Sequence, residues 1–163
     1  MYDRITWVKR DTLRSVDPEF DTTLRVQLYR DFVETGRAPS SARLAELLAA
    51  SIGEVRDSLE RLAAAKAIVL QPESREIMIA APLCAVPTPF LLRTEARSYF
   101  AACVWDALGV MAMLRRDATL ETSCPCCGEA LSIETRGGAL LTARGIIHFG
   151  VPARRWWESI VFS

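Results

Sequence analysis

Apolar positions between residues 18 and 66 recur every three or four residues, which is the spacing of an amphipathic helix. The pattern predicts three helices, over residues 18–35, 40–50 and 51–66. Asp17-Pro18 is typical of a helix start, and Ser51 with Glu54 fits a capping box. Two short apolar stretches, residues 67–70 and 76–80, then predict a hairpin, and three helices followed by a hairpin is the winged-helix order.

The pattern changes after residue 81, where residues 82–89 carry three prolines and predict a connector. Further along, strands are expected near residues 89–93, 118–122, 130–135, 145–149 and 160–162, with an apolar helix over 95–114 and a short helix after Pro152. The sequence therefore predicts an α+β fold with two domains. A winged-helix-like scaffold module covers residues 1–81, and a small mixed α/β domain, with short strands packed on a buried helix, covers residues 82–163.

Composition is that of a globular protein, because half of the 163 residues are apolar and a quarter are charged. The 20 basic and 20 acidic side chains cancel. The third predicted helix carries acids and bases in equal number, so it is a poor candidate for reading DNA. The second and third predicted helices resemble a helix-turn-helix. This unit is expected to serve packing or homodimerisation, and DNA is not an expected partner.

The N-terminal residues 1–14 lack the apolar core of a signal peptide. The apolar stretch 99–114 is too short for a comfortable membrane span and is interrupted by Asp106. We therefore expect a cytoplasmic protein without a membrane partner. In a reducing compartment, the five cysteines are expected to be free thiols or metal ligands.

Cys103 and Asp106 are the candidate catalytic residues. Their i, i+3 spacing places a thiol and a carboxyl on one face of the predicted apolar helix. Burial raises the pKa of a carboxyl, which can then deliver a proton near neutral pH. The neighbouring thiol can bind a soft electrophile as thiolate and pass its proton to the acid. In the alternative interpretation, Cys103 is a core residue and Asp106 caps a loop or pairs with an arginine.

A second thiol group is formed by Cys124, Cys126 and Cys127. Cys124 and Cys127 have the C-x-x-C spacing of a metal-binding knuckle, and Gly128 suits the tight turn after it. Zinc needs four ligands, and a second such pair is missing. A soft two-coordinate ion needs only two thiolates, which Cys103 and one cysteine of this group can supply. A loop without a function is the third alternative.

The residues just described resemble the organomercurial (alkylmercury) lyases. The resemblance covers about 130 residues of the chain, from near residue 35. It includes Val86-Pro87-Thr88-Pro89 and is strongest at Ala102–Leu108 and Ser123-Cys124-Pro125. It implies that Cys103 captures mercury, that Asp106 shuttles the proton to carbon, and that the N-terminal module is scaffold. Cys124 matches a structural cysteine of the family. No cofactor is implied, and mercury from the substrate or zinc is the candidate bound metal.

The sequence also departs from the family. Its members have a second catalytic cysteine on a late strand, after an aromatic residue, and residues 157–163 resemble the approach to that strand. Phe90 stands where a polar residue or histidine is expected. Two interpretations follow from these departures. The chain is a shortened form without the second thiol, or it has a different active site in which Cys126 or Cys127 substitutes for that thiol. The alternative functions are a thiolate metal-binding or regulatory protein and an enzyme of another pathway on the same scaffold.

Overall fold

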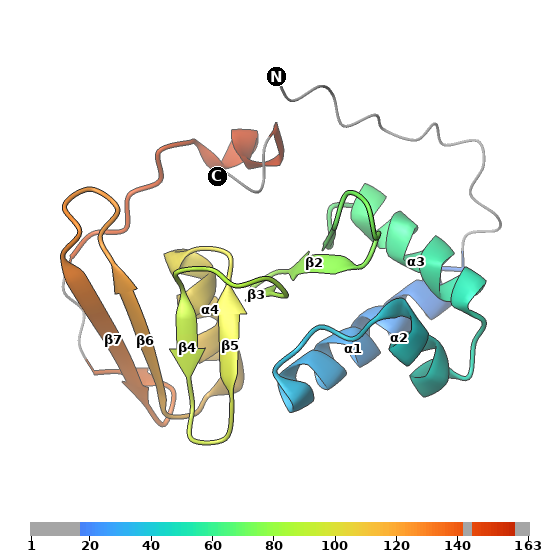
Figure 1. Cartoon of the computed structure of the whole chain (residues 1–163), viewed down its shortest axis with the longest axis horizontal. Coiled ribbons are helices and arrows are strands. Elements are labelled where there is room, and N and C mark those ends of the chain that lie inside the picture. The colour runs from blue at the N-terminus through green and yellow to red at the C-terminus, as the bar shows by residue number, and fades with distance from the viewer. Residues whose placement is uncertain (1–16, 142–144, 159–163) are drawn as a thin grey trace.

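The protein consists of three N-terminal helices followed by an antiparallel sheet with a fourth α-helix packed on it (Figure 1). The computed structural model describes residues 17–141 and 145–158. The helices in these ranges are α1 (Pro18–Thr35), α2 (Ser41–Leu48), α3 (Ile52–Ala64), α4 (Val104–Leu114) and the 3-10 helix η2 (Ala153–Glu158). The expected α+β class is confirmed.

Helix α1 has the ends that the sequence predicts. The Asp17 carboxylate accepts hydrogen bonds from the backbone N–H groups of Glu19 and Phe20, at 3.1 and 3.0 Å. At the other end, Gly36 adopts the left-handed conformation with φ of 76°. A β-carbon at Gly36 would lie 3.0 Å from the backbone oxygen of Ser98. The glycine therefore lets the end of α1 approach the sheet closely.

Helices α2 and α3 begin with the predicted caps. The Ser40 side chain accepts from the backbone N–H of Arg43. Ser51 and Glu54 form the reciprocal capping box, in which each side chain accepts from the backbone N–H of the other residue, at 3.2 and 3.0 Å. These bonds satisfy donors that the first turn of a helix leaves free. The three helices are then followed by an antiparallel strand pair, and a winged-helix relationship stays a prediction.

The described strands form one antiparallel sheet in the order β1-β2-β3-β5-β4-β6-β7-β8. Their bounds are β1 (Val69–Leu70), β2 (Ile77–Ala80), β3 (Leu83–Cys84), β4 (Leu91–Arg93), β5 (Ser98–Ala101), β6 (Ala118–Ser123), β7 (Ala130–Arg136) and β8 (Ala139–Leu140). The expected domain boundary after residue 81 falls between β2 and β3, which pair with each other through Ala80 and Leu83. The division into two domains stays a prediction.

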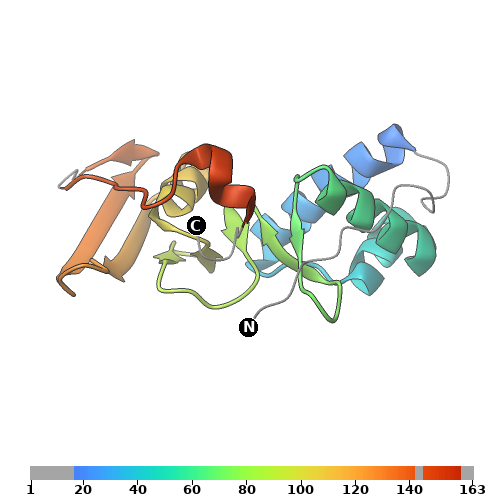
Figure 2. The same ribbon diagram turned by 90° about the horizontal axis from the view of Figure 1, so that it is seen from above.

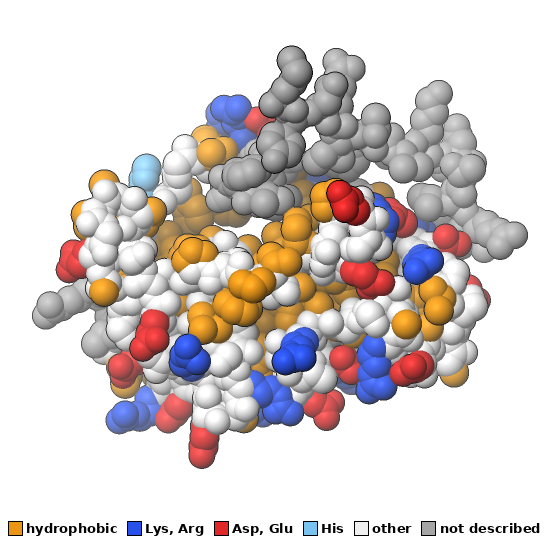
Figure 3. Space-filling view, in the orientation of Figure 1, with side chains coloured by type: hydrophobic (Ala, Val, Ile, Leu, Met, Phe, Trp, Pro, Cys, Tyr) orange, Lys and Arg blue, Asp and Glu red, His pale blue; other side chains and the backbone are white. Residues whose placement is uncertain are grey.

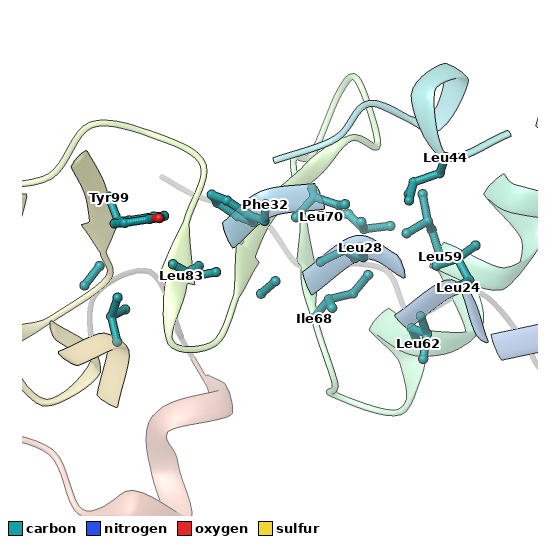
Figure 4. Close-up of a cluster of buried hydrophobic side chains, with 14 of the residues drawn as sticks. Leu24, Leu28, Phe32, Leu44, Leu59, Leu62, Ile68, Leu70, Leu83 and Tyr99 are labelled. Atoms are coloured by element: carbon teal, nitrogen blue, oxygen red, sulfur yellow. The ribbon is translucent and has the colours of Figure 1, made fainter. Parts of the chain in front are cut away.

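The buried hydrophobic side chains form a continuous cluster that extends from the helices into the sheet. Figure 4 shows Phe32 between the leucines of the helices on one side and Leu83 and Tyr99 on the other. Phe32, Leu83 and Tyr99 are at most 2% exposed. Their burial removes apolar surface from water, which favours the packing of the helices against the sheet.

Two tyrosine hydroxyls add hydrogen bonds across the same junction. The Tyr99 hydroxyl donates to the backbone oxygen of Val33 at the end of α1, at 2.8 Å. The Tyr29 hydroxyl donates to the backbone oxygen of Ala81 at the same distance, 2.8 Å. The two bonds therefore link α1 to strand β5 and to Ala81, the residue that follows β2.

The predicted helix over residues 95–114 is wrong in its first part. Residues 98–101 form strand β5, and the helix begins only at Val104. Its burial is also one-sided, because Ala107, Val110 and Met111 face the core while Trp105 is 56% exposed and Met113 is 40% exposed. In β5, Tyr99 and Ala101 are buried while Ser98 is exposed and Phe100 is half-buried. Because Phe100, on the less buried face, is also apolar, the sequence shows a continuous apolar run where a strand would show alternation.

Three other expectations concern short segments. The proline-rich connector contains strand β3, which the sequence did not predict. The strand expected near residues 145–149 is absent, and His148, which lies in this segment, is exposed. The expected strand at 160–162 lies outside the described residues, whereas the short helix after Pro152 is present as η2.

The surface carries charges of both signs. On the face shown in Figure 3, acidic and basic side chains alternate along the lower rim, and hydrophobic side chains gather over the middle of the sheet. In the two ranges that the structure describes, no helix is long and apolar enough to cross a membrane.

Candidate active site

Helix α4 begins with Cys103 as its N-cap. The Cys103 backbone is extended, with φ of −149° and ψ of 177°, and its sulfur accepts the backbone N–H of Asp106 at 3.4 Å. This is the position where serine or aspartate usually caps a helix. The sequence predicted that both residues lie within a helix, whereas the structure places the thiol at the helix end, where it is accessible from the loop side.

The Cys103 thiol and the Asp106 carboxyl contact each other directly. The distance from the Cys103 sulfur to Asp106 Oδ2 is 3.4 Å, and the thiol is the donor. Both residues are half-buried. The expectation that this thiol and this acid lie side by side is confirmed, while their chemical roles are a matter for the proposal below.

Burial dominates the electrostatics of the pair. It raises the pKa of Asp106 from the ordinary aspartate value, and the hydrogen bond from Cys103 offsets part of this effect. Burial also raises the pKa of Cys103, the backbone N–H of Asp106 lowers it, and the Asp106 charge raises it again. At neutral pH, the Cys103 thiol therefore keeps its proton. The Asp106 carboxyl beside it binds a proton more readily than an ordinary aspartate does.

Aromatic side chains surround the start of α4. The Trp105 ring meets Phe149 edge to face, with 6.2 Å between centroids and 74° between planes. Phe149 in turn lies 5.1 Å from the ring of Trp156, whose Nε1 donates to the backbone oxygen of Val151 at 2.8 Å. Figure 2 shows the segment 145–158 passing alongside α4. These contacts join three aromatic rings into one apolar cluster, and Trp105 of this cluster directly precedes Asp106 in the sequence.

Thr88 holds the backbone that precedes Cys103. Its hydroxyl donates to the backbone oxygen of Ala101 at 2.6 Å and accepts from the backbone N–H of Phe90 at 3.2 Å. Thr88 thereby fastens the Pro87–Pro89 segment to the end of β5, two residues before the thiol. The sequence showed this threonine only as part of the Pro-Thr-Pro motif and not as a positioning residue.

Cys84 is a further thiol within electrostatic range of the site. It is 3% exposed in β3, opposite Phe100 of β5. Burial raises its pKa, the backbone N–H of Val86 lowers it, and the Asp106 charge raises it further. The sequence places Cys84 in the proline-rich connector, and the pairing of β3 with β5 could not be seen there.

The group of Cys124, Cys126 and Cys127 lies in the turn between β6 and β7. Phe100 of β5 and Glu121 of β6 both pair with Leu91, and the two strands run in the same direction. Cys103 and Cys124 each follow three residues later, so they lie at the same end of the sheet (Figure 1).

A joint site in which Cys103 and one cysteine of this group bind a two-coordinate ion stays a prediction. Within residues 17–141 and 145–158, no group of three or more His, Cys, Asp or Glu side chains is arranged to hold a metal ion. Backbone N–H groups of Cys127 and Cys126 lower the pKa of Cys124. Cys124 thus differs electrostatically from Cys103, whose pKa is raised.

Two surface hollows lie away from these thiols. One, of about 480 Å³, is lined by α1 residues such as Asp21 and Tyr29. The other, of about 300 Å³, lies between Arg93 and Glu134. Neither hollow is lined by Cys103 or Asp106.

A family model of alkylmercury lyases matches residues 83–162. This range begins with β3 and contains Cys103, Asp106 and the cysteine-rich turn. Over residues 83–162 the chain is therefore similar to the alkylmercury lyases. No curated protein matches it.

The fold is also similar to that of a solved member of this group of proteins. The crystal structure of the mercury-bound form of MerB2 matches with a TM-score of 0.59 and 22% sequence identity, over 76% of this chain and 65% of that one. At this identity the similarity concerns the fold. The chain spans 65% of the length of the MerB2 chain, so the activity of the whole relative does not follow from the match.

Proposed function

We propose that this chain is an organomercurial lyase-like enzyme, in which Cys103 captures an organomercury(II) compound and Asp106 protonates its carbon–mercury bond. The observation that carries the proposal is the direct contact of a thiol with a half-buried carboxyl, at 3.4 Å, in a chain whose residues 83–162 are similar to this family. Since the reaction needs reduced thiols, the proposal includes a cytoplasmic location.

In the first step, the Cys103 sulfur bonds to the mercury of R–Hg–X, and X leaves as an anion. Mercury is a soft cation and prefers a thiolate over oxygen ligands. The thiol proton passes to the Asp106 carboxylate, which already accepts it as a hydrogen bond. The raised pKa of Asp106 favours this transfer, because burial makes the ionised carboxylate less stable than it is in water.

In the second step, Asp106 returns the proton to carbon. The electron pair of the carbon–mercury bond forms the new C–H bond, so R–H leaves and mercury(II) stays on the Cys103 sulfur. An anion or a small thiolate then fills the second position on mercury. Asp106 ends as a carboxylate, and the protons and charges balance.

The aromatic side chains at the start of α4 support an organic group on the substrate. Trp105 is 56% exposed and Phe149 is 39% exposed, so their rings are accessible next to the thiol–acid pair. Apolar rings of this kind bind an aryl or alkyl group by excluding water from it.

The test is incubation of the full chain with phenylmercury and excess free cysteine, with benzene measured by headspace gas chromatography. Wild type is expected to release benzene. Cys103→Ser should neither bind phenylmercury at this site nor release benzene. Asp106→Asn should still bind phenylmercury but release benzene about 10²-fold more slowly or worse, as is typical for loss of a general acid.

Glu95→Gln is the matched control, because Glu95 is an exposed acid in the turn between β4 and β5. It should release benzene at the rate of wild type. A wild-type chain that binds phenylmercury at all accessible thiols and releases no benzene would contradict the proposal. Equal rates for wild type and Asp106→Asn would place the proton donor elsewhere.

A further inference from the structure

The turn between β6 and β7 holds its three cysteines in a defined geometry. The backbone N–H of Cys124 donates to the oxygen of Glu129 at 2.8 Å, and the N–H of Gly128 donates to the oxygen of Cys124, also at 2.8 Å. Next to the turn, Ser123 at the end of β6 pairs with Ala130 at the start of β7. Gly128 has φ of +75°, a conformation that glycine adopts without strain. The turn is therefore closed at both ends and does not depend on a bound ion for its shape.

The sulfur of Cys124 is the acceptor at the centre of this turn. The backbone N–H groups of Cys127 and Cys126 are directed at it. Cys124 and Cys127 stand at i and i+3 of the turn that the Gly128 N–H closes on the Cys124 oxygen, so both thiols project from one short segment, whereas Cys126 contributes through its backbone. N–H groups directed at a sulfur stabilise the negative charge that a metal-bound thiolate keeps.

We propose that this turn is a second thiol site, in which Cys124 and Cys127 together bind one soft, two-coordinate cation of the mercury(II) class. The C-x-x-C spacing brings these two sulfurs together, and thiolates select soft metals. Two-coordination follows from the surroundings, because the part of the chain that the structure describes offers no third ligand arranged for a metal. Zinc, which takes four ligands, does not fit one such turn.

Binding is a ligand exchange without a redox change. The cation loses its two previous ligands, two sulfur–metal bonds form, and the thiol protons pass to solvent. Cys103 takes no part in this exchange, since it lies on α4 beyond strand β4. The site is therefore independent of lyase activity, and either proposal can fail alone.

The experiment titrates the full-length Cys103→Ser variant with mercury(II) in excess glutathione. Native mass spectrometry gives the number of ions per chain, and the sulfur-to-mercury absorbance in the ultraviolet gives the affinity. One ion per chain should remain bound, because two sulfurs on one turn outcompete separate monothiols. Cys127→Ser in this background should weaken retention at least 10-fold.

Cys126→Ser is the matched control, because it removes a neighbouring exposed thiol and keeps the backbone N–H. It should retain mercury like its parent. An equal loss in Cys126→Ser and Cys127→Ser would overturn the assignment of ligands. No retention against glutathione, or one ion shared between two chains, would overturn the two-coordinate site itself. Circular dichroism of each variant checks that the fold is unchanged.

Discussion

The Cys103 sulfur and Asp106 are joined by two hydrogen bonds of opposite direction. The sulfur accepts the backbone N–H of Asp106 and donates its own proton to the Asp106 carboxyl, both at 3.4 Å. One atom therefore caps the helix and supplies the proton that the proposed reaction needs. Variants of these two residues, and of the residues that hold α1 against the sheet, should change stability in measurable ways.

Asp106→Asn should increase the stability of the protein at pH 7. The pKa of Asp106 in the folded state is raised above the ordinary aspartate value of 3.8, so the folded state holds its proton more tightly than the unfolded state does. Below pH 3.8 both states are protonated and this difference has no effect. As pH rises through the folded-state pKa, the buried charge lowers the free energy of unfolding, and asparagine removes that penalty.

Urea unfolding at pH 7, 5 and 4 checks this expectation. The stability gain of Asp106→Asn should shrink as pH falls, while the exposed Glu95→Gln should show no such pH-dependent gain. A variant that is less stable than wild type at pH 7 would mean that Asp106 makes favourable contacts beyond those described.

Cys103→Ser should fold at least as stably as wild type. Serine is a preferred N-cap and its hydroxyl can accept the Asp106 backbone N–H that the sulfur now accepts. Cys103→Ala lacks an acceptor and should be less stable than Cys103→Ser by about 1 kcal/mol. Thermal unfolding of the two variants measures the difference. Equal stabilities would show that the sulfur is not a functional cap.

Tyr99→Phe should lower the free energy of unfolding by about 1 kcal/mol, since it leaves the Val33 carbonyl without its partner in a buried setting. Tyr29→Phe removes the corresponding bond to Ala81 at a more exposed place and should cost less. Guanidinium unfolding of both variants, followed by circular dichroism, separates them. The reverse order would contradict the view that Tyr99 is the stronger link between α1 and the sheet.

Gly36→Ala should be destabilising by more than about 1 kcal/mol, because alanine at a positive φ is strained and its β-carbon would lie 3.0 Å from the Ser98 oxygen. Gly53→Ala, within α3, meets only the Ser51 hydroxyl oxygen at 3.8 Å and should stabilise the helix by about 1 kcal/mol. The two melting temperatures should thus move in opposite directions. An unchanged or raised melting temperature of Gly36→Ala would contradict the strain expected at this position.

Local signals in the sequence were sufficient for the first three helices. Caps and glycine ends act within one turn of the chain, so Asp17, Ser51 and Gly36 could be interpreted without knowledge of the fold. The pairing of Cys103 with Asp106 was also predictable, because three residues along a helix start suffice to bring them together.

The remaining errors arise where neighbours distant in sequence decide the structure. Strand β5 carries an apolar residue, Phe100, on its less buried face, which hides the alternation that identifies a strand. Ile146 shows the opposite case, since its apolar surroundings in sequence suggested a strand and it is 95% exposed. The roles of Thr88 and Cys84 depend on strand pairing that no local pattern records.

Because a sulfur atom accepts the hydrogen bond that closes the first turn of α4, the strength of that bond should depend on whether the Cys103 thiol has bound a ligand. A lone pair shared with a bound electrophile is a weaker acceptor, so the amide of Asp106 should lose protection against hydrogen exchange as Cys103 fills. Substrate arrival would then loosen the backbone of the residue that must deliver the proton, and release would tighten it again.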